Sequence, residues 1–362
     1  MSTQIFNKTL IIGLGLIGGS FAKACKKYNV SKEIYAYDSN PESISLAKEL
    51  DVIDGSISLD EDLSSFDFVV LASPLSTYKD IIKAISHRTN GIGGNYNQLT
   101  FIDLGSVKKS NIKTKILPEN LRQNFIPCHP IAGSEKVGIE NSIDDLFLGK
   151  KFIICPENTN PDSLEKLENA VKQIGAIAEH IDSKRHDEIY ALTSHLPQFL
   201  SFLTSEFAPK EITDEFFKIS FRLNNSNPDI WGDIFKLNET NIEKFYMEFF
   251  DHLEVFEEDL KSEKFSEILE KASSINSSMK IENSDFDQSF FEESFSAIFF
   301  RAIIVLSYLQ VKDLERLQNY TGSGFRDFTS IMAIFSLPEQ KLSDLLQKNS
   351  QNILNLIDNC LQ

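Results

Sequence analysis

A glycine-rich turn near the N-terminus constrains the fold of this chain more than any other sequence feature. The apolar run Leu10–Ile12 leads into Gly13-Leu14-Gly15-Leu16-Ile17-Gly18, and a helical pattern follows to about residue 28. A second short strand pattern ends at Asp38, twenty residues after Gly18. Strand, glycine turn, helix, strand and acid in this order predict a Rossmann-type domain that binds a dinucleotide.

Each part of this turn has a mechanical role. Gly13 permits the tight turn, Gly15 lets the backbone approach a pyrophosphate at the helix N-terminus, and Gly18 allows close packing of helix on strand. Asp38 would accept hydrogen bonds from ribose hydroxyls and repel a 2′-phosphate, which favours NAD over NADP. A glycine turn without a ligand is the alternative, and it leaves the position of the acid unexplained. The expected cofactor-binding residues are Gly13, Gly15, Leu16, Ile17, Gly18, Asp38, Ser73 and Pro74.

Strand and helix patterns alternate up to about residue 183. The buried strand pattern 66–72 ends in Ser73-Pro74, the pattern 101–103 leads into Gly105-Ser106, and the pattern 125–128 delivers His129. Ligands of open parallel sheets bind at the carboxyl ends of the strands. We therefore expect Ser106 and His129 at the same edge as the nucleotide.

Beyond residue 186 the pattern is helical. We expect three parts: a dinucleotide-binding domain at 1–183, a helical substrate and dimerisation domain at 184–275, and a further helical half at 283–362. The segment Phe325–Ile331 can be laid on Phe217–Leu223, with Ser330 in the place of Arg222. This match predicts a degenerate repeat of the helical domain, and chance similarity between helices is the alternative. The predicted fold class is a Rossmann-type α/β domain followed by an all-α domain with a second, degenerate half.

The net charge and the cysteine spacing limit the classes of ligand and macromolecule that the chain is expected to bind. The net charge of −17 argues against nucleic acid or an anionic membrane surface as the main partner. The four cysteines follow no metal-ligand spacing, so we expect no metal site and free thiols in a reducing cytoplasm. No segment has the apolar run of about 18 residues that a membrane span needs.

The residues at the sheet edge suit hydride chemistry. Removing hydride from a carbinol carbon requires a base for the hydroxyl proton, and a neutral imidazole such as that of His129 serves near pH 7. Ser106 could hydrogen-bond the same hydroxyl or the imidazole, and Lys108 or Lys109 could supply positive charge. A histidine before proline in a loop is otherwise commonly structural. The cluster on one edge with a nucleotide site favours catalysis.

The helical part contributes candidates for substrate binding. Arg222 could hold a carboxylate in a bidentate fork, with a surface salt bridge as the alternative. His195 is either a buried core histidine or a substrate ligand, and the sequence leaves both open.

With these motifs the chain resembles the prephenate dehydrogenase family, which includes arogenate and cyclohexadienyl dehydrogenases. The resemblance covers about residues 9 to 260. It is carried by the segments Gly13–Ser20, Asp103–Lys108, His129–Glu135, Thr193–Pro197, and Arg222 with Pro228 and Trp231–Ile234. The second and third segments are the most diagnostic, since many dehydrogenases share the first.

The resemblance implies NAD-dependent oxidative decarboxylation of prephenate to 4-hydroxyphenylpyruvate, or of arogenate to tyrosine. By similarity His129 polarises or deprotonates the ring hydroxyl, Ser106 assists it, and Arg222 holds a substrate carboxylate. Glu135 looks like the family's acidic residue near the mouth of the site, and His195, Gln198 and Lys108 complete the expected substrate contacts. The family fold is a Rossmann domain followed by a helical domain that forms an intertwined homodimer.

The chain departs from the family pattern in three places. Gln198 stands where many members have a histidine that approaches a substrate carboxylate. Because glutamine is neutral, this contact would weaken, and the sequence leaves both prephenate and arogenate open as the substrate. Ile219 stands where the family often has aspartate. The extra helical half could imitate a partner's helices, so a monomer is an alternative to the homodimer. Two rival functions are another β-hydroxyacid-type dehydrogenase and an NAD-binding protein with a decayed site.

Overall fold

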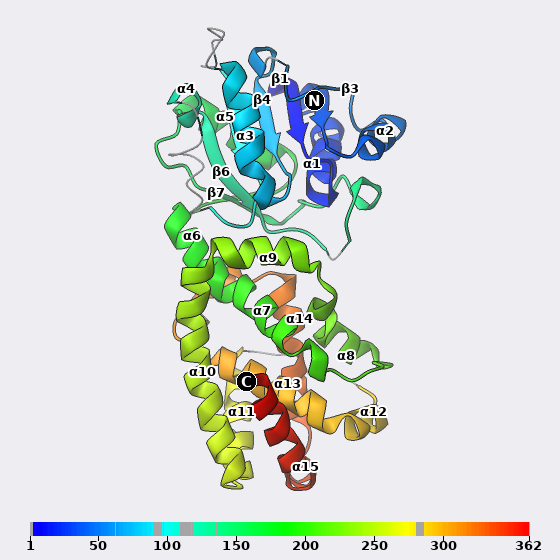
Figure 1. Ribbon diagram of the computed structural model, residues 1–362, viewed down its shortest axis with the longest axis vertical. Coiled ribbons are helices and arrows are strands. Elements are labelled where there is room, and N and C mark those ends of the chain that lie inside the picture. The colour runs from blue at the N-terminus through cyan, green and yellow to red at the C-terminus, as the bar shows by residue number, and fades with distance from the viewer. Residues whose placement is uncertain are drawn as a thin grey trace. The chain divides into compact units, whose positions relative to one another are not determined.

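The computed structural model describes residues 3–361 except 62, 90–95, 97, 109–116, 118, 135 and 280–285. By its contacts the chain divides into two compact units, residues 1–187 with 227–237, and residues 188–226 with 238–362 (Figure 1). The sequence places boundaries at 183 and between 275 and 283. In the structure the two predicted helical parts form one unit, and residues 227–237 belong to the first unit.

The first unit is built on an eight-stranded sheet with the order β3-β2-β1-β4-β5-β6-β7-β8. The neighbouring pairs are parallel except β6 with β7, which are antiparallel. The strands are β1 (Phe6–Ile12), β2 (Ser31–Tyr37), β3 (Gly55–Ser56), β4 (Phe68–Leu71), β5 (Thr100–Asp103), β6 (Phe125–Pro130), β7 (Lys151–Ile154) and β8 (Ile177–His180). The prediction of a Rossmann-type domain is confirmed, with two reversed strands, β7 and β8, added beyond β6.

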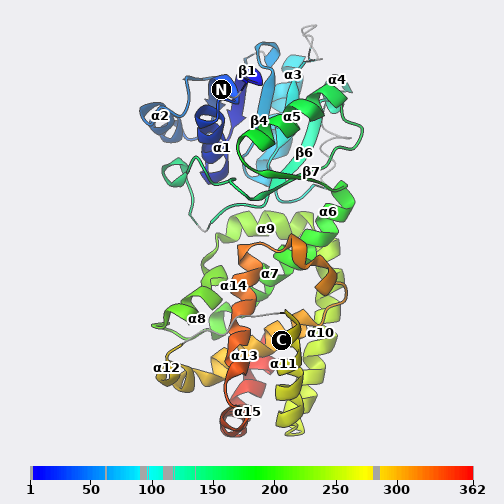
Figure 2. The ribbon, with the colours of Figure 1, turned by 180° about the vertical axis from the view of Figure 1, so that it is seen from behind.

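Helices cover both faces of this sheet. These helices are α1 (Leu16–Lys27), α2 (Pro41–Glu49), α3 (Tyr78–Thr89), α4 (Glu119–Arg122) and α5 (Pro161–Gln173). The unit also includes α9 (Pro228–Leu237), which packs on the 3₁₀ helix Leu75–Thr77 after β4, and α6 (Ser183–Tyr190) spans the boundary between the units. Alternate residues of β1 point to opposite faces, because side chains alternate along a strand. Ile11 joins the core under α1 and α5, whereas Leu10 and Ile12 join the core under α3. Figure 1 views the α3 face and Figure 2 the α5 face.

The second unit is helical. Its elements are the π-helix η5 (Ala191–His195), α7 (Leu196–Leu203), α8 (Glu215–Ser220), the 3₁₀ helix η7 (Arg222–Asn225), α10 (Glu239–Lys261), α11 (Phe265–Met279), α12 (Gln288–Glu293), α13 (Phe295–Leu309), α14 (Ser323–Thr329), the 3₁₀ helix η9 (Ser330–Ser336) and α15 (Glu339–Leu361). The sequence predicts a break near Pro197, and the structure has the π-helix directly before it. Proline lacks the N–H that would continue the α-helical ladder, and a wider turn accommodates that loss.

The stretch after residue 261 differs from its prediction. The sequence there is charged and serine-rich, and part of it is predicted to be a linker. In the structure α11 fills most of it, because Phe265, Ile268, Leu269 and Ala272 recur at helical spacing and are buried on one face. No described helix is long and apolar enough to cross a membrane.

Candidate active site

The glycine turn joins β1 to α1 with the geometry that its sequence predicts. Gly13 has φ +98°, and a Cβ there would lie 2.8 Å from the backbone of Ala72. A Cβ on Gly18 would lie 1.9 Å from the Gly13 carbonyl oxygen. A Cβ on Gly15 would meet open space. Two of the glycines therefore serve packing and the turn itself, whereas Gly15 faces the volume that a ligand would occupy.

The start of α1 suits a phosphate group. Gly15 is the N-cap, it offers no side chain to the first N–H groups, and the first turn holds no acidic residue. The backbone donors of Leu16 and its neighbours therefore lack a capping side chain, and the helix dipole favours an anion there. A pyrophosphate fits this end of the helix.

Asp38 lies next to the same turn. Its carboxylate accepts hydrogen bonds from the backbone N–H groups of Leu14 (2.7 Å) and Asn40 (2.8 Å). These bonds hold the carboxylate against the glycine turn, and each oxygen keeps a further lone pair for a hydroxyl donor. This position supports the expected role of Asp38 as acceptor for a ribose.

Ser73 and Pro74 follow β4 at the same edge. Thr77 donates a hydrogen bond to Ser73 through their hydroxyls (2.8 Å), and Pro74 is exposed at the start of a short 3₁₀ helix, Leu75–Thr77. The carboxyl edge of the sheet thus carries these residues, the glycine turn, and the segment after β5. Ser106 is half-buried in that segment.

His129 lies near the end of β6 and is half-buried. The loop that follows it reaches the nucleotide turn, because a Cβ on Gly133 would lie 3.8 Å from Ile17. The imidazole Nδ1 of His129 is 2.9 Å from Nε2 of His186, and Nδ1 of His186 is 2.8 Å from Oδ1 of Asp187. A carboxylate and two imidazoles therefore form a chain that ends at His129.

This chain determines the tautomers of both rings. His186 is fully buried, and burial lowers the pKa of its imidazole well below the usual range, so the ring is neutral near pH 7. The Asp187 carboxylate only accepts, so Nδ1 of His186 carries the proton and Nε2 accepts. His129 must then donate from Nδ1, which puts its basic lone pair on Nε2.

His186 and Asp187 are not predicted as site residues by the sequence patterns. They lie at the start of the helical pattern, 57 residues beyond His129, and no local motif links them to it. The adjacent His-Asp pair was the one available signal, since a histidine beside a carboxylate is a common way to orient an imidazole.

Lys108 is turned into the protein. Its side chain is fully buried, and its ammonium group bonds Asp103 Oδ2 and the carbonyl oxygen of Cys128, each at 2.5 Å. Its backbone N–H donates to Asp187 Oδ1 (2.8 Å). In the structure the Lys108 ammonium group thus forms an ion pair with Asp103. Binding of substrate by Lys108 stays a prediction. Lys109 and Glu135 lie outside the described residues.

Asp103 is the centre of this buried network. It accepts from the Gly105 N–H (3.1 Å) as well as from Lys108, and the Tyr78 hydroxyl lies 3.5 Å away. Burial raises the pKa of the Asp103 carboxyl, and Lys108 opposes that rise. Gly105 has no room for a side chain, because a Cβ would lie 2.6 Å from Leu75. The network supports both the segment of Ser106 and the β6 backbone next to His129.

The remaining predicted substrate residues belong to the helical unit. The Gln198 amide donates to the Leu223 carbonyl (2.8 Å) and accepts from the Ser226 hydroxyl (3.2 Å). The ring of His195 is buried, and its Nδ1 accepts from the Asn238 amide (3.0 Å). Both side chains therefore make structural hydrogen bonds, and their contacts with a substrate stay predictions.

Arg222 forms an ion pair within the same unit. Its guanidinium contacts Asp327 Oδ2 through Nε (2.6 Å) and through a terminal nitrogen (2.5 Å). The Arg222 side chain is 29% exposed and that of Asp327 19%. The binding of a substrate carboxylate by Arg222 likewise stays a prediction.

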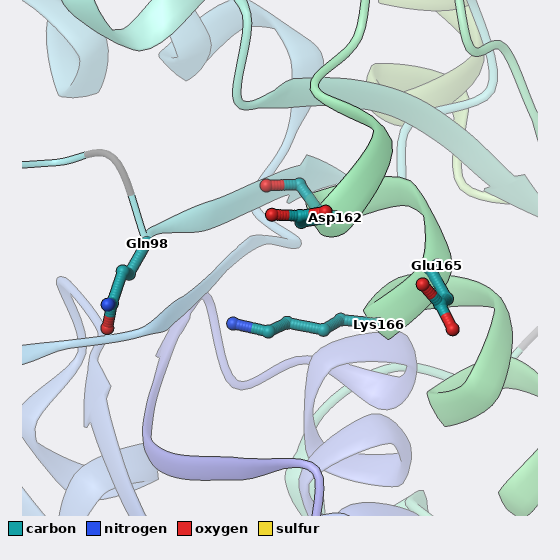
Figure 3. A pocket seen from close by; sticks show the side chains of 5 residues that line it. Gln98, Asp162, Glu165 and Lys166 are labelled. Carbon is teal, nitrogen blue, oxygen red and sulfur yellow. The ribbon is translucent and has the colours of Figure 1, made fainter.

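A pocket of about 340 Å³ lies elsewhere in the first unit (Figure 3). It is lined by Gln98, Asp162, Ser163, Glu165 and Lys166. Gln98 precedes β5, so this pocket lies toward the amino ends of the strands, away from the edge that carries the glycine turn and His129. No group of metal-binding residues occurs in the described part of the chain.

Comparison with known proteins identifies relatives of this architecture. Residues 21–180 match the family model described as "Prephenate dehydrogenase, nucleotide-binding domain", and residues 182–273 match "Prephenate dehydrogenase, dimerization domain". The chain is 28% identical over 252 residues to prephenate dehydrogenase of Bacillus subtilis, covering 66% of each chain. It is 29% identical to cyclohexadienyl dehydrogenase of Zymomonas mobilis, covering 64% of this chain and 80% of that protein.

A solved structure agrees. Prephenate dehydrogenase from A. aeolicus, in complex with hydroxyphenyl propionate and NAD+, is 32% identical in sequence, with a TM-score of 0.66. The match covers 78% of this chain and 99% of that one.

Proposed function

The chain belongs to the prephenate dehydrogenase family, and from this membership we propose that it catalyses an NAD-dependent oxidative decarboxylation in tyrosine biosynthesis. The substrate is prephenate, which yields 4-hydroxyphenylpyruvate, or arogenate, which yields tyrosine. The observation that carries the proposal is the Asp187–His186–His129 chain at the sheet edge that also bears the glycine turn. It supplies a base of defined tautomer beside a nucleotide site.

The residues fit NAD as the cofactor. The glycine turn and the N-terminus of α1 would hold the pyrophosphate, and Asp38 would accept from the adenosine ribose. Bound NAD supplies a hydride acceptor for the ring carbinol carbon. A relative is described in complex with NAD+, which supports the same cofactor here.

His129 then serves as the general base. Its Nε2 takes the proton of the ring hydroxyl while the carbon loses hydride to the cofactor. Loss of carbon dioxide then makes the ring aromatic, and the ring oxygen takes the proton back from the imidazolium to give the phenol. The imidazolium that forms donates from Nδ1 to the neutral His186, whose own N–H donates to the anionic Asp187. The carboxylate thereby stabilises the new positive charge across two hydrogen bonds. Ser106, in the neighbouring segment, would hydrogen-bond the substrate hydroxyl.

Arg222, His195, Gln198, Lys108 and Glu135 are retained as proposed substrate contacts. The family pattern supports them. Because Gln198 is neutral where many relatives have histidine, the preference between prephenate and arogenate needs a direct comparison.

The proposal also covers the oligomeric state of the protein and its cellular compartment. A match to a model described as a dimerization domain supports a homodimer, whereas a helical half that replaces a partner would yield a monomer. We also propose a reducing, cytoplasmic setting, which the four buried free cysteines support.

The test is turnover of prephenate and of arogenate, each with NAD and with NADP, followed at 340 nm. We expect NAD reduction with one or both substrates and a preference for NAD over NADP. His129→Asn should abolish turnover while NAD still binds in calorimetry. Absence of turnover with both substrates in a protein that binds NAD would instead support a decayed site, and activity only on a simple β-hydroxyacid would support the other rival.

A further inference from the structure

The second helical half, residues 286–361, packs on the first half, residues 188–226 and 238–279, inside one compact unit. Alignment of the repeat lays α14 on α8 and η9 on η7. In the structure α14 packs against α8, η9 packs against α8, and α14 packs against η7. The two copies thus make reciprocal contacts, in which each short helix meets the segment that follows its counterpart. Such reciprocity is the mark of an interface with twofold symmetry.

The ion pair of Arg222 with Asp327 joins the two copies at this contact. In the alignment Asp327 corresponds to Ile219, and Ser330 corresponds to Arg222. The first copy therefore has the arginine without the aspartate, and the second copy has the aspartate without the arginine. Each copy keeps the half of the motif that the other lacks.

A symmetric pair of such motifs would make two ion pairs, each from the arginine of one copy to the aspartate of the other. Here one of them exists, Arg222 with Asp327. The equivalent second contact would join positions 330 and 219. Position 330 does meet α8 in the structure, because the Ser330 hydroxyl lies 2.7 Å from the hydroxyl of Ser220, one residue after Ile219. The second ion pair is thus absent because both of its charged residues are replaced.

The contact between the halves is a continuous core. Helix α13 of the second half is buried on nearly all sides and packs on α10 of the first half as well as on α15. Phe217 of the first half is fully buried against Phe290 and Phe291 of the second, with ring centroids 5.5 Å and 6.4 Å apart. A helix that is apolar all round has no stable existence outside a core.

Polar groups also pair across this contact. Arg301 of α13 is buried and donates to the hydroxyls of Ser201 and Thr204, and it lies over the ring of Phe221 of the first half. The hydroxyl of Tyr308 donates to the Leu192 carbonyl in the π-helix (2.8 Å). Each of these buried groups needs its partner from the other half, so the two halves fold as one body.

We propose that the second helical half takes the place of a partner subunit, so that one chain with one nucleotide-binding domain is a complete monomer. Asp327 is the residue that the replaced partner would contribute, and it positions Arg222 in cis. The second, symmetry-related ion pair is absent, because Ile219 and Ser330 stand at its two positions. This inference rests on contacts within the helical unit and stands independently of the proposed reaction.

Two measurements test it. Sedimentation velocity of the full chain over a wide concentration range should give one species near 41.0 kDa, and calorimetry should give one NAD per particle. A species of twice that mass at all concentrations would overturn the proposal. Neither measurement depends on turnover. Failure of this proposal can therefore be distinguished from failure of the proposed reaction.

The second measurement rebuilds the lost ion pair. In a double-mutant cycle of Ile219→Asp and Ser330→Arg, the double variant should unfold at higher urea concentration than the sum of the single shifts predicts. Lys218→Asp with Ser330→Arg is the matched control one residue out of register, and it should show no such coupling. Equal behaviour of the two cycles would overturn the twofold relation, and the single variants show whether each change is tolerated.

Discussion

Nδ1 of His129 lies 2.9 Å from Nε2 of His186, and this distance sets the protonation of the candidate base. His186 is tied in turn to Asp187, so the proton positions along the chain follow from a carboxylate that can only accept. The candidate base is therefore oriented by two groups that are themselves fully buried.

His186 is the first residue to test as a positioning residue. His186→Phe removes the acceptor of the His129 N–H and should lower kcat by about 10²-fold, while the Michaelis constant for NAD stays near its original value. His186→Gln keeps an acceptor and should lose less. In both variants the imidazolium loses its link to Asp187, so the acid limb of the kcat–pH profile should move to lower pH. An unchanged kcat and profile in a folded His186→Phe protein would remove His186 from the mechanism.

Burial of neutral His186 predicts a stability that falls in acid. Its folded-state pKa lies well below the unfolded value near 6.5, so below pH 6.5 the unfolded chain binds a proton that the folded chain does not. The stabilisation is complete above that pH and declines as pH falls, by up to about 1.4 kcal/mol per pH unit. Urea unfolding between pH 7 and pH 5 should show a shallower decline for His186→Gln.

The buried pair of Lys108 and Asp103 predicts a structural role for Lys108. Lys108→Met leaves the Asp103 carboxylate buried without its counter-charge and should destabilise the fold by about 3–5 kcal/mol. Adding Asp103→Asn should recover much of that loss, because the uncompensated charge is gone. Urea unfolding of the three variants measures this. If Lys108→Met raised only the Michaelis constant of the substrate and left stability unchanged, Lys108 would be a substrate contact as the sequence suggests.

Alanine substitutions at Gly15 and Gly18 should affect different properties, NAD binding in the first case and stability in the second. A Cβ at Gly15 meets no atom within 4 Å, so Gly15→Ala should fold normally and bind NAD more weakly. A Cβ at Gly18 lies 1.9 Å from the Gly13 oxygen, so Gly18→Ala should lower the melting temperature. Thermal unfolding and calorimetric NAD titration check both variants. Unchanged NAD affinity in a folded Gly15→Ala protein would show that the space beside Gly15 is not a ligand site.

The local patterns of the chain were sufficient for the Rossmann-type domain. The turn at Gly13–Gly18, the acid at Asp38 and the strand ends before Ser106 and His129 are written in consecutive residues, and the topology of parallel strands brings those ends to one edge. The antiparallel β7 was not foreseen, because a short apolar strand has the same pattern in either direction.

The sequence by itself determined which candidate residues follow the strand ends at the sheet edge, and it indicated a degenerate repeat of the helical half. Only the tertiary structure decided their partners: His186 and Asp187 for His129, Asp103 for Lys108, and Asp327 for Arg222. The reason is physical. A strand or a turn follows from the conformational preferences of neighbouring residues, whereas a hydrogen bond or ion pair between distant residues depends on how whole elements pack. That packing buries the charged side chain of Lys108. It also brings the repeated segment, α14, into contact with its counterpart α8.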